Sequence, residues 1–173
     1  LCEDWRNSGF GIYVHWPFCT SKCPYCDFNS HTAVNIEESL WLTAYKNEIE
    51  RIAKSTGPRL VQSIFIGGGT PSLMSSALVG GIIDKIAQVW NIDRNCEITL
   101  EANPTSVEAK KFKAFKTAGI NRVSMGIQSL NDNHLKRLGR LHTASEAIAS
   151  FEIARNIFEK TTFDLIYALQ DQS

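Results

Sequence analysis

The sequence has no apolar run close to the ~18 residues that a membrane-spanning helix needs, and no charged, apolar leader opens it. We therefore expect neither a membrane span nor a secretory signal. It also has no excess charge, because 18 Lys and Arg residues balance 18 Asp and Glu residues. No basic stripe stands out, which argues against a nucleic-acid partner and against an anionic membrane surface.

Cysteine is scarce and unevenly placed, with five residues in 173. Three of them, Cys19, Cys23 and Cys26, form a C-x3-C-x2-C spacing. An odd, clustered set does not suit a disulfide framework and indicates metal ligation in a reducing compartment. Three thiolates can hold a 4Fe–4S cluster and leave its fourth iron open to another ligand. Zinc is the alternative, because His15 and His31 flank the triplet and could complete a four-ligand set.

Strand-like and helix-like runs alternate along a chain whose length and 43% hydrophobic content suit one globular domain. The expected strands cover residues 11–15, 61–66, 97–101, 120–126 and 162–169. The expected helices cover residues 36–55, 75–90, 105–118 and 143–158. Thr105-x-x-Glu108 and Thr143-x-x-Glu146 read as capping boxes at the starts of the last two helices. This order predicts parallel βα units, whose largely apolar strands we expect to be covered on both faces.

Residues able to carry chemistry lie where the expected strands end, which helps to choose between a doubly wound sheet and a (β/α) barrel. The cysteine loop follows the first strand, and Gly67-Gly68-Gly69-Thr70-Pro71-Ser72 follows the second. Glu101 and Gln128 close the next two, and Asp164 lies within the fifth. Barrel enzymes place their sites at the carboxyl ends of strands, so a site shared by five strands favours a curved, barrel-like sheet.

Each of these residues also has a plainer reading. The glycine run lets backbone approach a ligand closely, but it matches neither a P-loop nor a dinucleotide-binding fingerprint and also suits a simple turn. Glu101 either accepts backbone N–H groups or binds a ribose hydroxyl or an ammonium group. Gln128 likewise either forms hydrogen bonds within its loop or contacts a ligand. Arg140 is either solvated or grips a carboxylate through two hydrogen bonds.

Taken together, these motifs resemble the radical S-adenosylmethionine (SAM) proteins related to oxygen-independent coproporphyrinogen III oxidase. The resemblance rests on His-Trp-Pro-Phe-Cys at 15–19, Lys-Cys-Pro-Tyr-Cys-Asp-Phe-Asn-Ser-His at 22–31, the glycine run, Glu-Ala-Asn-Pro at 101–104 and Arg-Val-Ser-Met-Gly-Ile-Gln-Ser at 122–129. It covers almost the whole chain in order and is strongest to the haem-chaperone branch, HemW. It implies an α/β fold, a partial (β/α)6 TIM-like radical SAM barrel that stops after about five βα units.

The resemblance also implies a set of ligands and partners. Cys19, Cys23 and Cys26 would bind a 4Fe–4S cluster whose open iron takes SAM. The cofactor-binding residues would be Tyr13, Tyr25, Gly68, Gly69, Thr70, Glu101, Gln128, Arg140 and Asp164. Implied partners are haem or a porphyrin, haem-accepting proteins and an electron donor for the cluster. The implied location is the cytoplasm, or an organelle matrix in a eukaryote.

Two departures from the family pattern shape the functional prediction. Phe28 stands where the oxidases carry a further cysteine, which favours a haem chaperone over the alternative, oxidative decarboxylation of coproporphyrinogen III. A zinc-binding interaction module is the alternative from another class. After Asp164, Ala168-Leu169-Gln170-Asp171 replaces the family's Gly-Leu-Pro-Gly, so we expect a changed loop there.

Family members continue through a sixth strand and a C-terminal domain. The resemblance therefore implies that residues 1–173 are one incomplete radical SAM core. Its fifth strand would leave an open apolar edge, so we expect this chain to express poorly or to associate.

Overall fold

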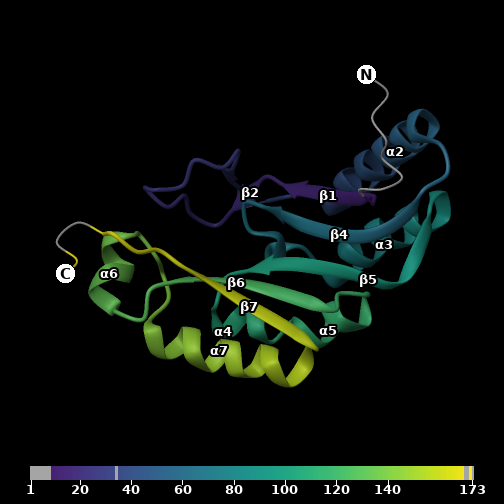
Figure 1. The fold of residues 1–173 in the computed structure, drawn as a ribbon. Helices are drawn as coiled ribbons and strands as arrows, with labels where there is room; N and C mark the ends of the chain where they lie inside the picture. Colours follow the sequence, from purple (N-terminus) through teal and green to yellow (C-terminus); the bar gives the residue numbers. More distant parts are fainter. Residues whose placement is uncertain (1–8, 34, 170–171, 173) are drawn as a thin grey trace.

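Five parallel strands build a single curved sheet in the order β1-β4-β5-β6-β7 (Figure 1). The structure, a computed structural model, describes residues 9–33, 35–169 and 172. The strands are β1 (Gly11–Trp16), β4 (Leu60–Gly68), β5 (Asn91–Ala102), β6 (Arg122–Gln128) and β7 (Lys160–Leu165). Successive βα units place each strand parallel to the strand before it, and this sheet has that order. The predicted α/β partial barrel is therefore confirmed.

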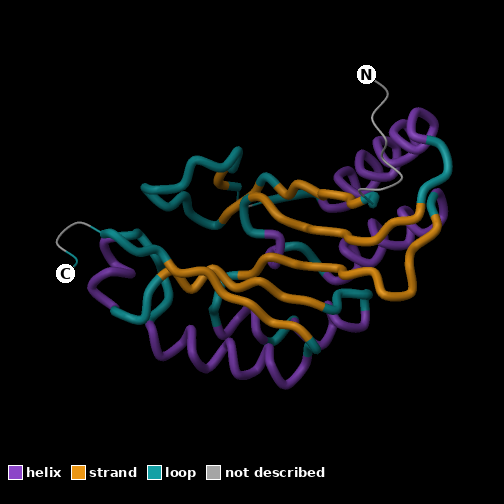
Figure 2. The backbone as a smooth tube through the Cα atoms, viewed as in Figure 1, coloured by secondary structure: helices purple, strands orange, loops and turns teal. Residues whose placement is uncertain are grey.

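Helices lie against the outer side of the sheet, where Figure 2 shows them as a layer beside the strands. They are α2 (Glu38–Thr56), α3 (Ser76–Val89), α4 (Ser106–Ala109), α5 (Phe112–Thr117) and α7 (Ala144–Ile157). The helix α6 (Asp132–Arg137) lies instead beyond the carboxyl ends of β6 and β7 (Figure 1). Short elements complete the fold: β2 (Phe18–Cys19) pairs with β3 (His31–Thr32), and the 3-10 helix η1 spans Pro71–Leu73. Within the described residues, no helix is long and apolar enough to cross a bilayer.

The core lies between the helices and the outer face of the sheet. Ile64 and Leu100 are fully buried there, against helix residues such as Ile82, Phe112 and Phe115. Burying one such side chain stabilises the fold by roughly 1.5–3 kcal/mol. This layer positions the strand ends on which the candidate site is built.

The expectation of strands covered on both faces is wrong. Alternate residues of a strand point to opposite faces, and the inner face carries half-buried or exposed polar side chains such as Glu97 and Arg122. Tyr13, on the same face, is 58% exposed. The curved sheet therefore has one aliphatic face that packs on helices and one polar face that points into the open barrel.

Several element boundaries differ from the predicted ones. The expected helix 105–118 divides into α4 and α5, and β5 begins at Asn91 rather than at residue 97. The helix α6 was not predicted, although Asn131 caps it by accepting the N–H groups of residues 133 and 134. The capping box of Thr143 is confirmed. At Thr105 only half of the predicted box forms, because the Glu108 carboxylate bonds elsewhere.

The last strand, β7, ends at Leu165, four residues before the predicted end of the fifth strand. Of the altered run, Gln170 and Asp171 lie outside the described residues, while Ala168 adopts a positive φ of 59°. Among the described strands, β7 pairs only with β6 and forms the edge of the sheet. The expected association of the chain through this edge stays a prediction.

Candidate functional site

The cysteine loop runs from the end of β1 to β3 and lies at the carboxyl end of the sheet (Figure 1). Pairing of β2 with β3 closes it, and a turn bond joins the N–H of Cys26 to the carbonyl of Cys23 at 3.0 Å. His15 Nε2 lies 2.9 Å from the Asn29 carbonyl oxygen and holds the far side of the loop. All three cysteines of the triplet are free thiols; Cys19 is buried and the other two are half-buried.

These thiols line a cavity of about 640 Å³ at the carboxyl ends of the strands. Most of the residues predicted for cofactor binding line it as well: Tyr25, Gly68, Gly69, Thr70, Glu101, Gln128, Arg140 and Asp164. Tyr13 is the exception. Its hydroxyl lies 3.3 Å from His15 Nδ1 and its ring stacks on Phe65, outside the lining of the cavity.

The end of β4 lies directly against the cysteine loop. The N–H of Gly69 donates to the Trp16 carbonyl at 2.6 Å, and the N–H of Thr70 donates to the Phe18 carbonyl at 2.8 Å. A Cβ at Gly69 would lie 2.6 Å from the Phe18 oxygen and 3.0 Å from Cys19 Sγ. Gly69 is therefore required by close approach, because a side chain there would occupy the space beside a thiol.

Two polar side chains at the ends of β5 and β6 face the cavity. Burial raises the pKa of the Glu101 carboxyl. The Gly68 N–H, which donates to this carboxylate at 3.1 Å, has the smaller and opposite effect. Gln128 adopts a φ of 70°, which is rare for a residue with a side chain and costs of order 1–3 kcal/mol. A break in the β6–β7 register precedes it. Strain of this kind persists where the surroundings hold the residue in place.

Arg140 connects the wall of the cavity to the cysteine loop. Its Nη2 donates to Asn103 Oδ1 at 2.7 Å and to the Gly126 carbonyl at 2.8 Å, while Nη1 lies 3.5 Å from Cys23 Sγ. Its Nε is buried and has no hydrogen-bond partner among the residues that the structure describes. Burial raises the pKa of nearby Tyr25 to about 12, against the opposing charge of Arg140. The Arg140 guanidinium group thus lies at the Cys23 thiol, and its Nε–H is left as a donor without a partner among the described residues.

Three further residues of the cavity wall were missed in the sequence: Asn103, Glu108 and His142. The Glu108 carboxylate accepts from the Ser72 hydroxyl and from the Asn103 N–H, and burial raises its pKa. His142 is buried with Nε2 3.1 Å from the Ile127 carbonyl oxygen, and burial lowers its pKa. Asn103 lies within the Glu-Ala-Asn-Pro motif, which was the available signal for it. Glu108 was assigned to a helix cap instead.

Comparison with known proteins identifies the family. The radical SAM superfamily profile matches residues 13–173. The chain belongs to the radical SAM superfamily. The haem chaperone HemW of Haemophilus influenzae is 44% identical over 168 residues, which are 94% of this chain and 44% of that protein. The mitochondrial radical S-adenosyl methionine domain-containing protein 1 of Bos taurus is 39% identical over 93% of this chain and 37% of its own length. The chain thus spans less than half the length of these relatives.

Solved structures agree with this assignment. The radical SAM enzyme coproporphyrinogen III oxidase (HemN) of Escherichia coli superposes with a TM-score of 0.85 at 29% identity. The match covers 95% of this chain and 38% of the oxidase. The cobalamin-dependent radical enzyme OxsB, at a TM-score of 0.60 and 14% identity, shares the fold alone. Membership of the radical SAM superfamily implies a 4Fe–4S cluster and SAM.

The residues of this radical SAM chain fit such a cluster. Its three thiols share one cavity, the Thr70 hydroxyl lies 3.4 Å from Cys19 Sγ, and Arg140 supplies positive charge at Cys23. A tetrahedral zinc site needs four ligands about 2.0–2.3 Å from one point. In the described part of the chain, no three His, Cys, Asp or Glu side chains gather around a single ion position. This finding applies to the three thiols as much as to a zinc set, so the choice of a cluster rests on membership of the radical SAM superfamily.

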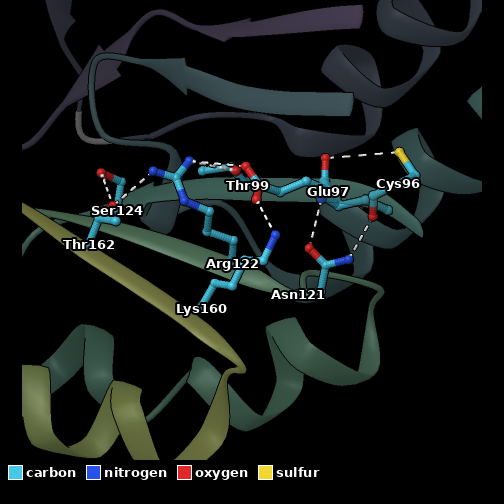
Figure 3. A network of polar contacts seen from close by, with 9 residues as sticks. Cys96, Glu97, Thr99, Asn121, Arg122, Ser124, Lys160 and Thr162 are labelled. Carbon is cyan, nitrogen blue, oxygen red and sulfur yellow. Dashed lines mark hydrogen bonds and ion pairs between the residues drawn. The ribbon is translucent and has the colours of Figure 1, made fainter. Parts of the chain in front are cut away.

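A network of polar contacts braces the inner face of the radical SAM sheet below the cavity (Figure 3). Arg122 donates to Thr99 at 3.1 Å and to Thr162 at 3.0 Å, so it joins β5, β6 and β7. Glu97 lies 3.4 Å from Arg122 and 2.9 Å from Lys160. The network reaches the cavity because the Thr162 hydroxyl donates to that of Ser124 at 3.1 Å.

Proposed function

We propose that this chain holds a 4Fe–4S cluster on Cys19, Cys23 and Cys26, with SAM beside it, as the radical SAM part of a HemW-type haem chaperone. The observation that carries the proposal is the shared cavity. Three free thiols line it, and Thr70 and Arg140 each direct a donor at one of the sulfurs. Donors at sulfur suit thiolates that bind a metal cluster.

The other residues of the cavity wall divide by chemistry into groups for the polar parts of SAM. Glu101 and Asp164 supply acceptors for ribose hydroxyl or ammonium groups, and Arg140 Nε supplies a buried donor for a carboxylate. Gly68, Gly69 and Gln128 shape the space beside the thiols, and Tyr25 covers it from the cysteine loop. When bound, the reduced cluster and SAM supply one-electron cleavage of the SAM C–S bond.

The chaperone function is preferred to the oxidase for two reasons. Phe28 lines the cavity, 57% exposed, where the resemblance places a further cysteine in the oxidases. The HemW relatives of Haemophilus influenzae and Escherichia coli are 44% and 39% identical, each over 94% of this chain. Haem, haem-accepting proteins and an electron donor are the partners proposed with this function. The proposed location is the cytoplasm, or an organelle matrix in a eukaryote; the relative from Bos taurus is named as mitochondrial.

The cluster is tested by iron and sulfide analysis after anaerobic assembly. We expect about four irons per chain, and large losses in Cys19→Ser, Cys23→Ser and Cys26→Ser. Cys96→Ser is the matched control, because this free cysteine lies outside the cavity and its loss leaves the iron content unchanged. Full iron content in all three triplet variants would contradict the proposed cluster.

The chaperone function is tested by haem titration of the protein produced from its complete reading frame, with its cluster assembled. We expect a saturable change in the Soret band and transfer of the haem to an apo-haemoprotein. Absence of any spectral change would refute haem binding. Anaerobic conversion of coproporphyrinogen III with SAM and a reductant would support the oxidase instead.

A further inference from the structure

The side chain of Asn103 lies between the two groups that contact cysteine sulfurs. Its Oδ1 accepts from Arg140 Nη2 at 2.7 Å, and its Nδ2 lies 3.4 Å from Thr70 Oγ1. A guanidinium group has only donors, so the amide oxygen must face Arg140 and the amide NH2 must face Thr70. The orientation of the amide is therefore set by the chemistry of its neighbours.

Both partners of Asn103 continue to a thiol. The Thr70 hydroxyl accepts from the amide and donates its own proton toward Cys19 Sγ, at 3.4 Å. Arg140 directs Nη1 at Cys23 Sγ, at 3.5 Å, while its Nη2 is held by the amide oxygen. The neutral side chain of Asn103 thus connects the two residues, Thr70 and Arg140, that donate to the sulfurs of Cys19 and Cys23.

Asn103 is itself held firmly. Its N–H donates to the Glu108 carboxylate at 2.8 Å, and its carbonyl accepts from the Thr105 N–H at 2.9 Å. Glu108 is buried and is also bonded to the Ser72 hydroxyl. The following Pro104 restricts the backbone of Asn103 to extended conformations. A side chain fixed from its own backbone can fix the donors that it touches.

We propose that Asn103 is a positioning residue that sets the reduction potential of the cluster by aligning Thr70 and Arg140 on the sulfurs of Cys19 and Cys23. The proposal rests on the cluster of the proposed function. Reduction adds negative charge to the cluster, so donors aimed at its sulfurs stabilise the reduced form and raise the potential. Asn103 carries no charge, so its removal changes alignment without changing the charge of the site.

The test is an anaerobic spectroelectrochemical titration of the protein produced from its complete reading frame, with its cluster assembled. Asn103→Ala should shift the oxidised-to-reduced ratio about tenfold at a given potential, a fall of ~59 mV for a one-electron couple. Asn133→Ala is the control, because that residue is exposed on α6 and its loss should leave the potential unchanged. A wild-type potential in Asn103→Ala would overturn the proposal.

A second variant separates alignment from general damage. Thr70→Val keeps the branched shape but has no hydroxyl, so it should also lower the potential. In that background Asn103→Ala should shift the potential less than it does alone, because both act partly through one hydrogen bond. If Asn103→Ala assembles no cluster, an unchanged potential in Thr70→Val overturns the proposal. Failure of the wild-type chain to bind iron would instead contradict the proposed function.

Discussion

Substituting Gly69 by alanine tests whether the end of β4 must touch the cysteine loop. The added Cβ would lie 2.6 Å from the Phe18 carbonyl oxygen and 3.0 Å from Cys19 Sγ. The φ of Gly69 lies outside the left-handed region, so the penalty is steric and not conformational. A backbone carbonyl cannot swing aside as a flexible side chain does, and overpacking of this kind costs about 1–3 kcal/mol.

The assay is urea unfolding of the apoprotein, followed by the fluorescence of its four tryptophans. With a denaturant slope of about 2 kcal/mol/M, the midpoint of Gly69→Ala should fall by roughly 0.5–1.5 M. Iron content after anaerobic assembly should fall as well, because Cys19 Sγ or the Phe18 backbone must move.

Gly80→Ala is the matched control for this substitution. Gly80 lies within α3, and a Cβ there meets Ala118 Cβ at 3.6 Å, an ordinary contact. Alanine in a helix interior gains about 0.5–1 kcal/mol over glycine, so the midpoint should rise. A urea midpoint and an iron content in Gly69→Ala equal to those of the wild-type protein would refute the steric argument. Midpoint shifts of the same sign in Gly69→Ala and Gly80→Ala would refute it as well.

Three further substitutions test other parts of the structure by the same unfolding assay. Burial raises the pKa of Glu108 above its ordinary value of 4.5, so its contribution to stability is lost as pH rises through the raised pKa. Glu108→Gln should therefore flatten the fall in the free energy of unfolding as pH rises above 4.5, while Glu101 contributes equally to both proteins. Tyr45→Phe removes the 2.6 Å bond to the His15 carbonyl and should cost about 0.5–1.5 kcal/mol; no change would show that this bond is not stabilising. Arg122→Met should cost about 1–2 kcal/mol, and its exposed control Arg155→Ala less than about 0.5 kcal/mol; equal effects would count against the bracing network.

Local spacing predicted the thiols, and the resemblance to the radical SAM family implied most of the cavity wall. The cysteine triplet, the glycine run and the motif around Glu101 each occupy a few adjacent residues, and their chemistry can be read without knowing where the chain goes. Alternation of strands and helices then predicted parallel βα units, whose strand ends meet at one edge. The positions of Thr70 and Gln128 in the cavity wall follow from that topology.

Contacts between distant segments were decided by tertiary structure alone. Arg140 and Cys23 are 117 residues apart, and no periodicity in the sequence indicates that a guanidinium group lies at that sulfur. Glu108 matched a helix cap locally, but the buried Ser72 hydroxyl and the Asn103 N–H offered its carboxylate stronger partners. The spacing of the cysteines thus indicated what the site can bind. Packing between strand ends decided which donors touch its sulfurs, because hydrogen bonds depend on distance in space and not along the chain.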